Sequence, residues 1–443
     1  MLALLAARCG NIAAAEDALA DALAAALTHW PARGIPENPQ AWLYTTARHR
    51  LLDAARSAAE RTRAEYDEEA IEAMFRADDT SEEIPDARLK LLFVCAHPAI
   101  DAAVRAPLMM QTVLGLEAAE IGRAFLVPET AMAQRLVRAK RKIKEAAIPF
   151  VLPTRSDMPA RLEAVLEAIY GCFALGSEAA PRDSDGVAPR AITLAASSAE
   201  KRSRSDLEAP AADLAADVTN DPADNPADDL ADEARFLANL LAHLLPDEPE
   251  VLGLAARISL AQARRAARHG PRGEYVPLEE QDTARWDPHL VDWGERLLQR
   301  AHACGRIGRF QLEAAIESVH LARARSGGTD WQALALLYEG LMRLAPSIGA
   351  AVGQAVALGH AQSPALGLAA LERIERTVRE AFQPAWAARA HLLAMSGRPE
   401  LFSEAIQALD EAAARAPNEA VRDHLQCKRR ALVDRGPANP SSV

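Results

Sequence analysis

LEAAEIGRAFLVPETAMAQRLVRAKRKIK, residues 116–144, has the clearest structural pattern in this sequence. It divides into a short helix at 116–125, a tight turn at 126–128 and a longer helix at 129–144. Pro128 suits the first turn of the second helix, because its missing N–H would have no partner there. Two packed faces are expected, formed by Ala118, Ile121, Gly122 and Phe125 in the first helix and by Met132, Leu136, Ala139 and Ile143 in the second. The pattern predicts a helix-turn-helix.

The opposite face of the second helix is polar at its start and increasingly basic toward its end. In such a motif the N-terminal turns reach base edges and later cations bind phosphates. A solvated basic face on an ordinary helical hairpin is the alternative, but the motif and the basic patch are separate criteria, and both are met. The candidate DNA-binding residues on this face are Thr130, Gln134, Arg135, Arg138, Lys140, Arg141, Lys142 and Lys144.

Composition supports a helical protein of two or three domains. The 443 residues are 50% hydrophobic and 25% charged, as in globular proteins, and only 5% are aromatic, which favours helices over strands. No apolar run approaches the ~18–20 residues of a membrane span. The five cysteines are scattered, without a C-x-x-C pair, which fits a reducing compartment. We therefore expect an all-α, cytoplasmic protein that does not enter a membrane.

Charge is segregated along the chain despite a net charge of −12. Residues 1–150 carry 18 Lys or Arg and 21 Asp or Glu, but ten of those acids lie in 65–86. The flanking segments are therefore cationic. A second acidic stretch, 205–234, contains ten acids and no base. A basic site on an acidic body is compatible with nucleic-acid binding.

The C-terminal part shows a repeat signal. After Trp386, Leu393 and Gly397 and a three-residue insertion in the turn, the spacing of the second helix of a tetratricopeptide unit is kept by Ala405, Leu409, Ala412 and Pro417. The start of another unit is reproduced by Trp331, Leu334, Ala335 and Tyr338. Any Ala/Leu helical hairpin imitates part of this pattern. Stacked helix pairs are expected there, with small residues where helices approach each other.

Catalytic and metal-binding signatures are absent from the sequence. It has no phosphate-binding glycine loop, no H-E-x-x-H and no G-x-S-x-G. The eleven histidines are dispersed, and His49, His97 and His320 are interpreted as surface or core residues. We therefore expect no enzymatic activity, no catalytic residue, no metal site and no cofactor.

The same helices resemble a known family. AEIGRAFLVPETAMAQRLVRAKRKI (119–143) closely resembles region 4 of sigma-70-type RNA polymerase sigma factors of the extracytoplasmic-function class, in particular a subgroup with a long helical C-terminal extension. AEDALADALAAALTHWP (15–31) and PENPQAWLYTTARHRLLDAAR (36–56) resemble region 2, and LKLLFVCAHPAI (89–100) resembles the opening of region 4. The extension is matched by LLPDEPEVLGL, RRAAR, PLEEQD, RW, FQLEAAIESVH and TDWQALALLY, so that only about 176–228 lacks a counterpart.

The resemblance implies a promoter-recognition subunit without catalysis of its own, with core RNA polymerase and promoter DNA as partners. Its implied polymerase contacts are Glu16, Asp17, Asp21 and Leu23; its −10 residues are Trp42, Arg48, Arg50 and Arg56; and Ala133, Gln134 and Arg138 would read the −35 element. Trp42 is equally well interpreted as a core aromatic, and Asp17 and Asp21 as charges near a helix N-terminus. Ala20 and Leu23 stand where the family has Gln and Phe, and 174–177 replaces an Asn-Glu-Gly-Tyr run.

The expected organisation follows from these patterns. Its parts are sigma region 2, N-terminally short, at 1–64, an acidic linker at 65–86, the region 4 helix-turn-helix at 87–150, a connecting helix at 151–175, a disordered acidic tether at 176–228 and a tetratricopeptide-like helical extension at 229–435. The extension is expected to regulate the sigma part and to bind a protein partner. Two other functions stay open: a stand-alone helix-turn-helix regulator, and an interaction scaffold built on the repeats.

Overall fold

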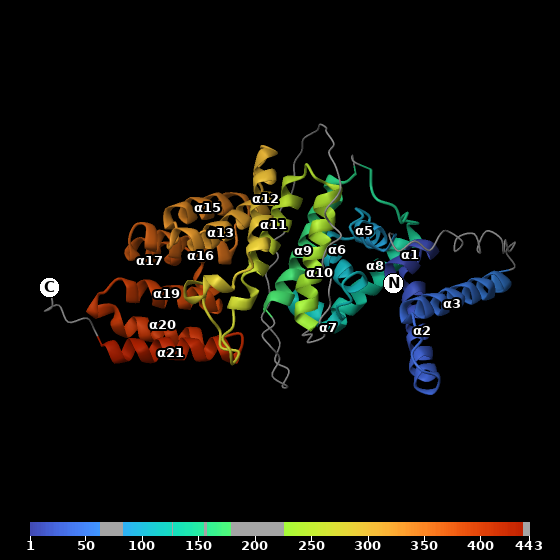
Figure 1. Ribbon diagram of the computed structural model, residues 1–443, viewed down its shortest axis with the longest axis horizontal. Coiled ribbons are helices and arrows are strands. Elements are labelled where there is room, and N and C mark those ends of the chain that lie inside the picture. Colours follow the sequence, from blue (N-terminus) through green and yellow to red (C-terminus); the bar gives the residue numbers. More distant parts are fainter. Residues whose placement is uncertain (63–82, 126, 155–156, 179–225, 437–443) are drawn as a thin grey trace. The chain divides into compact units, whose positions relative to one another are not determined.

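The computed structural model describes residues 1–62, 83–125, 127–154, 157–178 and 226–436 (Figure 1). Within these ranges every regular element is a helix, apart from an isolated bridge between His269 and Tyr275, so the all-α class is confirmed. The expected linker and tether fall almost entirely outside the described residues. Two compact units are present, one from Met1 to Ala174 and one beginning at Leu175, and each is considered separately.

The first unit opens with three helices, α1 (Leu2–Cys9), α2 (Ile12–Arg33) and α3 (Pro39–Thr62). Asn11 begins α2 by accepting a hydrogen bond from the Ala14 N–H at 3.3 Å. Small side chains let α2 pack closely against α1 and α3, and the buried ones are Ala15, Ala18, Ala22 and Ala26. The segments 15–31 and 36–56, which resemble region 2, are therefore almost wholly helical.

The rest of the first unit surrounds the core of α5 (Glu83–Cys95) and α6 (Ala102–Thr112). Its largest fully buried side chains include Phe93, Leu108 and Met109. Burial raises the pKa of Cys95 and Cys172 to about 12, so neither thiol is ionised at neutral pH.

The helix α9 (Pro159–Glu178) packs into this core. Arg161 donates a hydrogen bond to the Phe93 carbonyl at 3.4 Å. A Cβ on Gly171 would lie 2.2 Å from the Met110 methyl, so α9 and α6 approach closely. The segment that was expected to connect domains therefore contributes to the first unit up to Ala174.

The second unit begins with α10 (Pro226–Leu244), α11 (Pro249–Ala263), α12 (Pro288–Ala303) and α13 (Arg309–Leu321). Nearly all of α11 is buried, because α10, α12 and α13 pack around it. Glu317 of α13 is buried and forms ion pairs with Arg264 and with Arg257. Burial alone would raise the pKa of Glu317, but the two arginines hold it at about 2.

Consecutive helices of the second unit then pack against their neighbours along the chain, from orange to red in Figure 1. These are α15 (Trp331–Leu344), α16 (Ile348–Ala361), α17 (Pro364–Glu372), α18 (Arg376–Ala381), α19 (Gln383–Met395), α20 (Phe402–Ala414) and α21 (Glu419–Arg435). The short elements are α14 (Arg323–Ser326) and four single turns, η1 (Arg265–Ala267), η2 (Leu278–Glu280), η3 (Thr283–Arg285) and η4 (Pro399–Leu401). Leu393, Ala405, Leu409 and Ala412 share one buried cluster.

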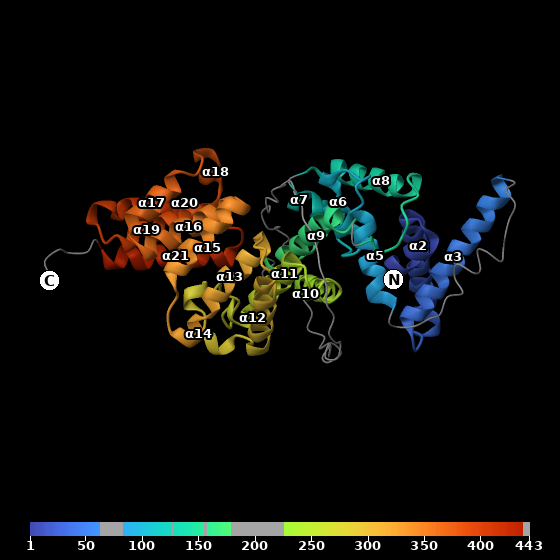
Figure 2. The ribbon, with the colours of Figure 1, turned by 90° about the horizontal axis from the view of Figure 1, so that it is seen from above.

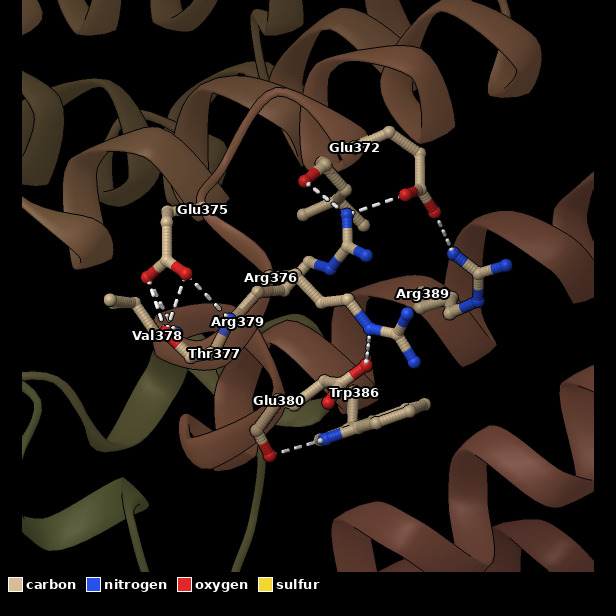
Figure 3. A network of polar contacts seen from close by, with 10 residues as sticks. Glu372, Glu375, Arg376, Thr377, Val378, Arg379, Glu380, Trp386 and Arg389 are labelled. Atoms are coloured by element: carbon tan, nitrogen blue, oxygen red, sulfur yellow. Dashed lines mark hydrogen bonds and ion pairs between the residues drawn. The ribbon is translucent and has the colours of Figure 1, made fainter.

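Ion pairs hold the short helix α18 against its neighbours (Figure 3). Glu372 at the end of α17 binds Arg379 of α18 and Arg389 of α19. Glu375 caps α18 by accepting from the N–H groups of Thr377 and Val378. The charged residues here stabilise helix termini and helix pairs, which gives them a structural role.

Candidate nucleic-acid interface

The helix-turn-helix consists of α7 (Ala118–Ala124) and α8 (Glu129–Glu145). The turn is tight: Val127 N–H donates to the Gly122 carbonyl at 2.8 Å, and a Cβ on Gly122 would lie 2.7 Å from the Val127 oxygen. Pro128 stands just before the helix rather than in its first turn, since its extended backbone makes it the N-cap. Figure 2 shows α8 beside α6 and α7, which cover its apolar face.

The buried face of α8 consists of the four side chains predicted from periodicity, Met132, Leu136, Ala139 and Ile143. In α7, Ile121 and Gly122 are buried and Ala118 is half-buried. Phe125, in the turn that follows α7, is half-buried too. The helical pattern therefore gave the orientation of α8 correctly, and its other face is turned to solvent.

Most candidate DNA-binding side chains lie on that solvent face. Ala133 is half-buried, and the exposed ones are Thr130, Gln134, Arg135, Arg138, Arg141, Lys142 and Lys144. Arg141 lies 3.4 Å from Glu145 one turn on, an exposed pair of small energetic value. Within the described ranges, no ion pair involves Arg135, Arg138, Lys142 or Lys144, so four cations face solvent together.

Lys140 differs from the other cations of α8. Its side chain is 12% exposed, and its Nζ lies 2.6 Å from Oε1 of Glu16 on α2. The ion pair joins a residue expected on phosphate to a residue expected on polymerase. In this structure the two side chains therefore bind each other within the first unit.

The remaining polymerase candidates lie on the outer face of α2. Asp17, Asp21 and Leu23 are exposed. Leu27, one turn beyond Leu23, is 79% exposed, although it was not among the sequence candidates. Its position at i+4 from Leu23 is the signal that could have found it. Two exposed leucines and two carboxylates therefore share one helix.

The candidates for the −10 element lie on α3. Trp42 is half-buried, with its ring 5.6 Å from that of Trp30 in an edge-on arrangement. Arg50 is exposed, Arg48 is half-buried, and Arg56 lies 3.8 Å from Asp53. Trp42 on α3 thus contacts Trp30 of α2 and keeps part of its surface in solvent.

Sequence reasoning missed a group of rings in the second unit. His360 stacks on Trp331 with ring centroids 3.9 Å apart, and its Nε2 lies 2.8 Å from Nε2 of His391. His320 contacts Trp331 edge-on, with ring centroids 6.3 Å apart. The residues come from α13, α15, α16 and α19, at spacings that have no local period. Burial lowers the pKa of all three histidines.

Metal and membrane sites find no support in the part of the chain that the structure describes. No three His, Cys, Asp or Glu side chains gather there in a geometry that could hold a metal ion. None of the helices described is both long and apolar enough to cross a bilayer.

Comparisons with known proteins identify a family at the N-terminus and a relative along nearly the whole chain. Residues 1–61 match the family described as Sigma-70 region 2. Residues 218–302 match a family of unknown function, DUF6596. Uncharacterized protein R00370 of Rhizobium meliloti (strain 1021) is 32% identical over 438 residues, which cover 98% of this chain and 92% of that protein. No solved structure matches the chain.

Proposed function

We propose that the chain, a member of the sigma-70 family, directs core RNA polymerase to the −10 and −35 elements of promoters. It belongs to one family with the Rhizobium meliloti protein. It would be a sigma factor of the extracytoplasmic-function class, acting in the cytoplasm without catalysis of its own. The observation that carries this proposal is the match of residues 1–61 to sigma-70 region 2.

The exposed face of α8 supports a role in reading the −35 element. Gln134 and Arg138 are four residues apart and therefore point the same way. Both side chains make bidentate hydrogen bonds to base edges, Gln to adenine and Arg to guanine. Lys142 and Lys144, nearer the end of the helix, would bind phosphates and set the position of α8 on the duplex.

The helix α3 would bind the −10 element. Arg50 offers an exposed guanidinium for the phosphate backbone. Trp42 keeps enough of its ring in solvent to stack on an unpaired base, while Trp30 fixes its orientation. Arg48 and Arg56 would contribute further positive charge along the same helix.

The outer face of α2 would bind core polymerase. Leu23 and Leu27 supply an apolar centre, and Asp17 and Asp21 supply flanking charge. Protein interfaces place apolar anchors at the centre of a polar rim in this way. Glu16, on the same helix, would join this surface if its bond to Lys140 opened.

The second unit, a tetratricopeptide-like extension in this proposal, would regulate the sigma part and offer its stacked helices to a protein partner. Support comes from charge: the acidic stretch 205–234 carries the sign that competes with DNA for the cations of α8. Truncation after Glu178 tests this role, because α9 then stays with the first unit. Altered promoter-directed transcription supports regulation, and unchanged initiation by a soluble truncated protein contradicts it.

Core polymerase binding without DNA separates a sigma factor from a stand-alone regulator or a scaffold. The full chain should retain core polymerase in a pull-down at moderate salt, and Leu23→Ser with Leu27→Ser should weaken retention at least 10-fold, as loss of interface anchors does. Leu336→Ser is the matched control, since Leu336 lies on α15 of the other unit and its exposure, 69%, falls between those of Leu23 and Leu27. No retention of core polymerase by the wild-type chain would contradict the proposal.

A further inference from the structure

We propose that Val137 reads the 5-methyl group of a thymine in the promoter, an inference that rests on the proposed DNA-binding role of α8. Val137 is 66% exposed and is the one large hydrophobic side chain of α8 that is exposed. Gln134, one turn before it, and Arg141, one turn after it, are exposed too. Val137 therefore lies in the middle of the face that would enter the major groove.

The packing of α8 explains why Val137 cannot join the core. Leu136, its neighbour in sequence, is buried against the rest of the first unit. Successive residues of a helix differ by about 100° in direction, so Val137 is turned away from that packed side. Its closest outward neighbours are Gln134, Arg138 and Arg141, all polar.

Single exposed apolar side chains are common on proteins and need no explanation by themselves. Val137 differs from them by its location on the proposed DNA-binding face. A thymine presents a methyl group in the major groove, and among base edges this is the one that rewards an apolar contact. Valine is short and has one strongly preferred rotamer in a helix, so placing it against a methyl group costs little side-chain entropy. Gln134 and Arg138 are longer and can reach polar edges of adjacent base pairs.

The experiment removes only the 5-methyl group of a thymine from the promoter DNA. Holoenzyme made from core RNA polymerase and the full chain first selects its −35 element from a random promoter library. Each thymine of the selected element is then replaced in turn by 2′-deoxyuridine. At one position the wild-type holoenzyme should bind about 3- to 5-fold more weakly, which corresponds to about one buried methyl group. Val137→Ala holoenzyme should be insensitive at that position.

Control variants separate the loss of the contact with thymine from a general effect of the substitution on the protein. Val151→Ala removes an equally apolar side chain of the same unit that is 55% exposed, and it should keep the wild-type response to deoxyuridine. Val137→Thr keeps the shape and branching of the side chain but replaces one of its two methyl groups with a hydroxyl, so it should reduce the response without unfolding α8. Thermal unfolding of each variant checks that the first unit is intact.

Two failures can be told apart. If holoenzyme selects an element but every deoxyuridine substitution affects wild type and Val137→Ala equally, or if the element contains no thymine, the assignment of Val137 is wrong while the sigma function stands. If holoenzyme shows no sequence-selective binding at all, the proposed function fails, and the assignment of Val137 fails with it.

Discussion

Lys140 on α8 and Glu16 on α2 form an ion pair in which the ammonium lies 2.6 and 2.7 Å from the two carboxylate oxygens. The residues are 124 positions apart in sequence. Both are partly shielded from water, which strengthens the attraction and also makes an unpaired partner unfavourable. The proposed DNA-reading helix is thereby attached to the proposed polymerase-binding helix.

Glu16→Gln should destabilise the first unit by about 1–3 kcal/mol, because Lys140 loses its charged acceptor. It should also steepen the salt dependence of DNA binding by about 0.9 in log–log slope if the released ammonium reaches a phosphate. Asp17→Asn, at an exposed neighbouring position, should change stability by less than about 0.5 kcal/mol. Equal stability of both variants in thermal unfolding would show that the ion pair contributes nothing.

Lys142→Gln with Lys144→Gln should lower the salt slope of promoter binding by about 1.8, since two exposed cations would no longer displace counterions. Lys140→Gln should leave the slope near the wild-type value, because Lys140 is bound to Glu16. Affinity measured across a series of salt concentrations gives both slopes. An unchanged slope in the double variant would make this cluster a solvated surface only.

Arg138→Ala should cost about 1–3 kcal/mol of binding to the preferred promoter and relax the preference at one base pair. Competition among all single-base variants of the selected −35 element measures the change. A uniform loss on every sequence would instead place Arg138 on the phosphate backbone.

Gly122→Ala should destabilise the helix-turn-helix by about 1–3 kcal/mol, because the new methyl group would lie 2.7 Å from the Val127 carbonyl oxygen. Gly349→Ala is the control: its Cβ would meet nothing within 4 Å, so α16 should keep or slightly gain stability. Thermal unfolding distinguishes the two. A neutral Gly122→Ala would show that the turn can open without cost.

The second unit should lose stability as the pH falls below about 6.5, the ordinary pKa of histidine. Burial lowers the pKa of His360 and His391. The neighbouring His360 and Lys428 lower the pKa of His391 further, whereas Glu279 acts in the opposite direction. The unfolded chain therefore takes up protons before the folded chain does, and the free energy of unfolding declines. Calorimetry between pH 8 and pH 5 should show a smaller decline for His391→Gln than for His289→Gln. His289 is exposed on α12, and equal declines would contradict this account.

Local pattern was sufficient for the helices and for the orientation of α8. Met132 and Leu136 are buried as the helical period requires, and prolines and glycines mark the ends of most helices. The connecting helix expected at 151–175 was placed only in part, since α9 begins at Pro159 and continues to Glu178. Gly176 lies within α9 and does not end it, so the local sequence alone does not decide how far this helix runs.

Contacts between distant segments could not be predicted from the sequence. The bond between Glu16 and Lys140, and the contact between His360 and His391, join residues whose spacing carries no local signal. Val137 was overlooked for a related reason. The face that it shares with Gln134 and Arg138 was judged by charge, and the exposed fraction of each side chain becomes visible only once the packed side of α8 is known.

Reconstituted run-off transcription shows whether the chain acts as a sigma factor. Core RNA polymerase, the full chain and a random promoter library are combined, and the transcripts are sequenced to identify the templates used. Transcripts should require the chain and start downstream of a shared pair of elements. Arg138→Ala should relax one position of the upstream element. A chain that leaves core polymerase without specific initiation on any template would contradict the claim that it is a sigma factor.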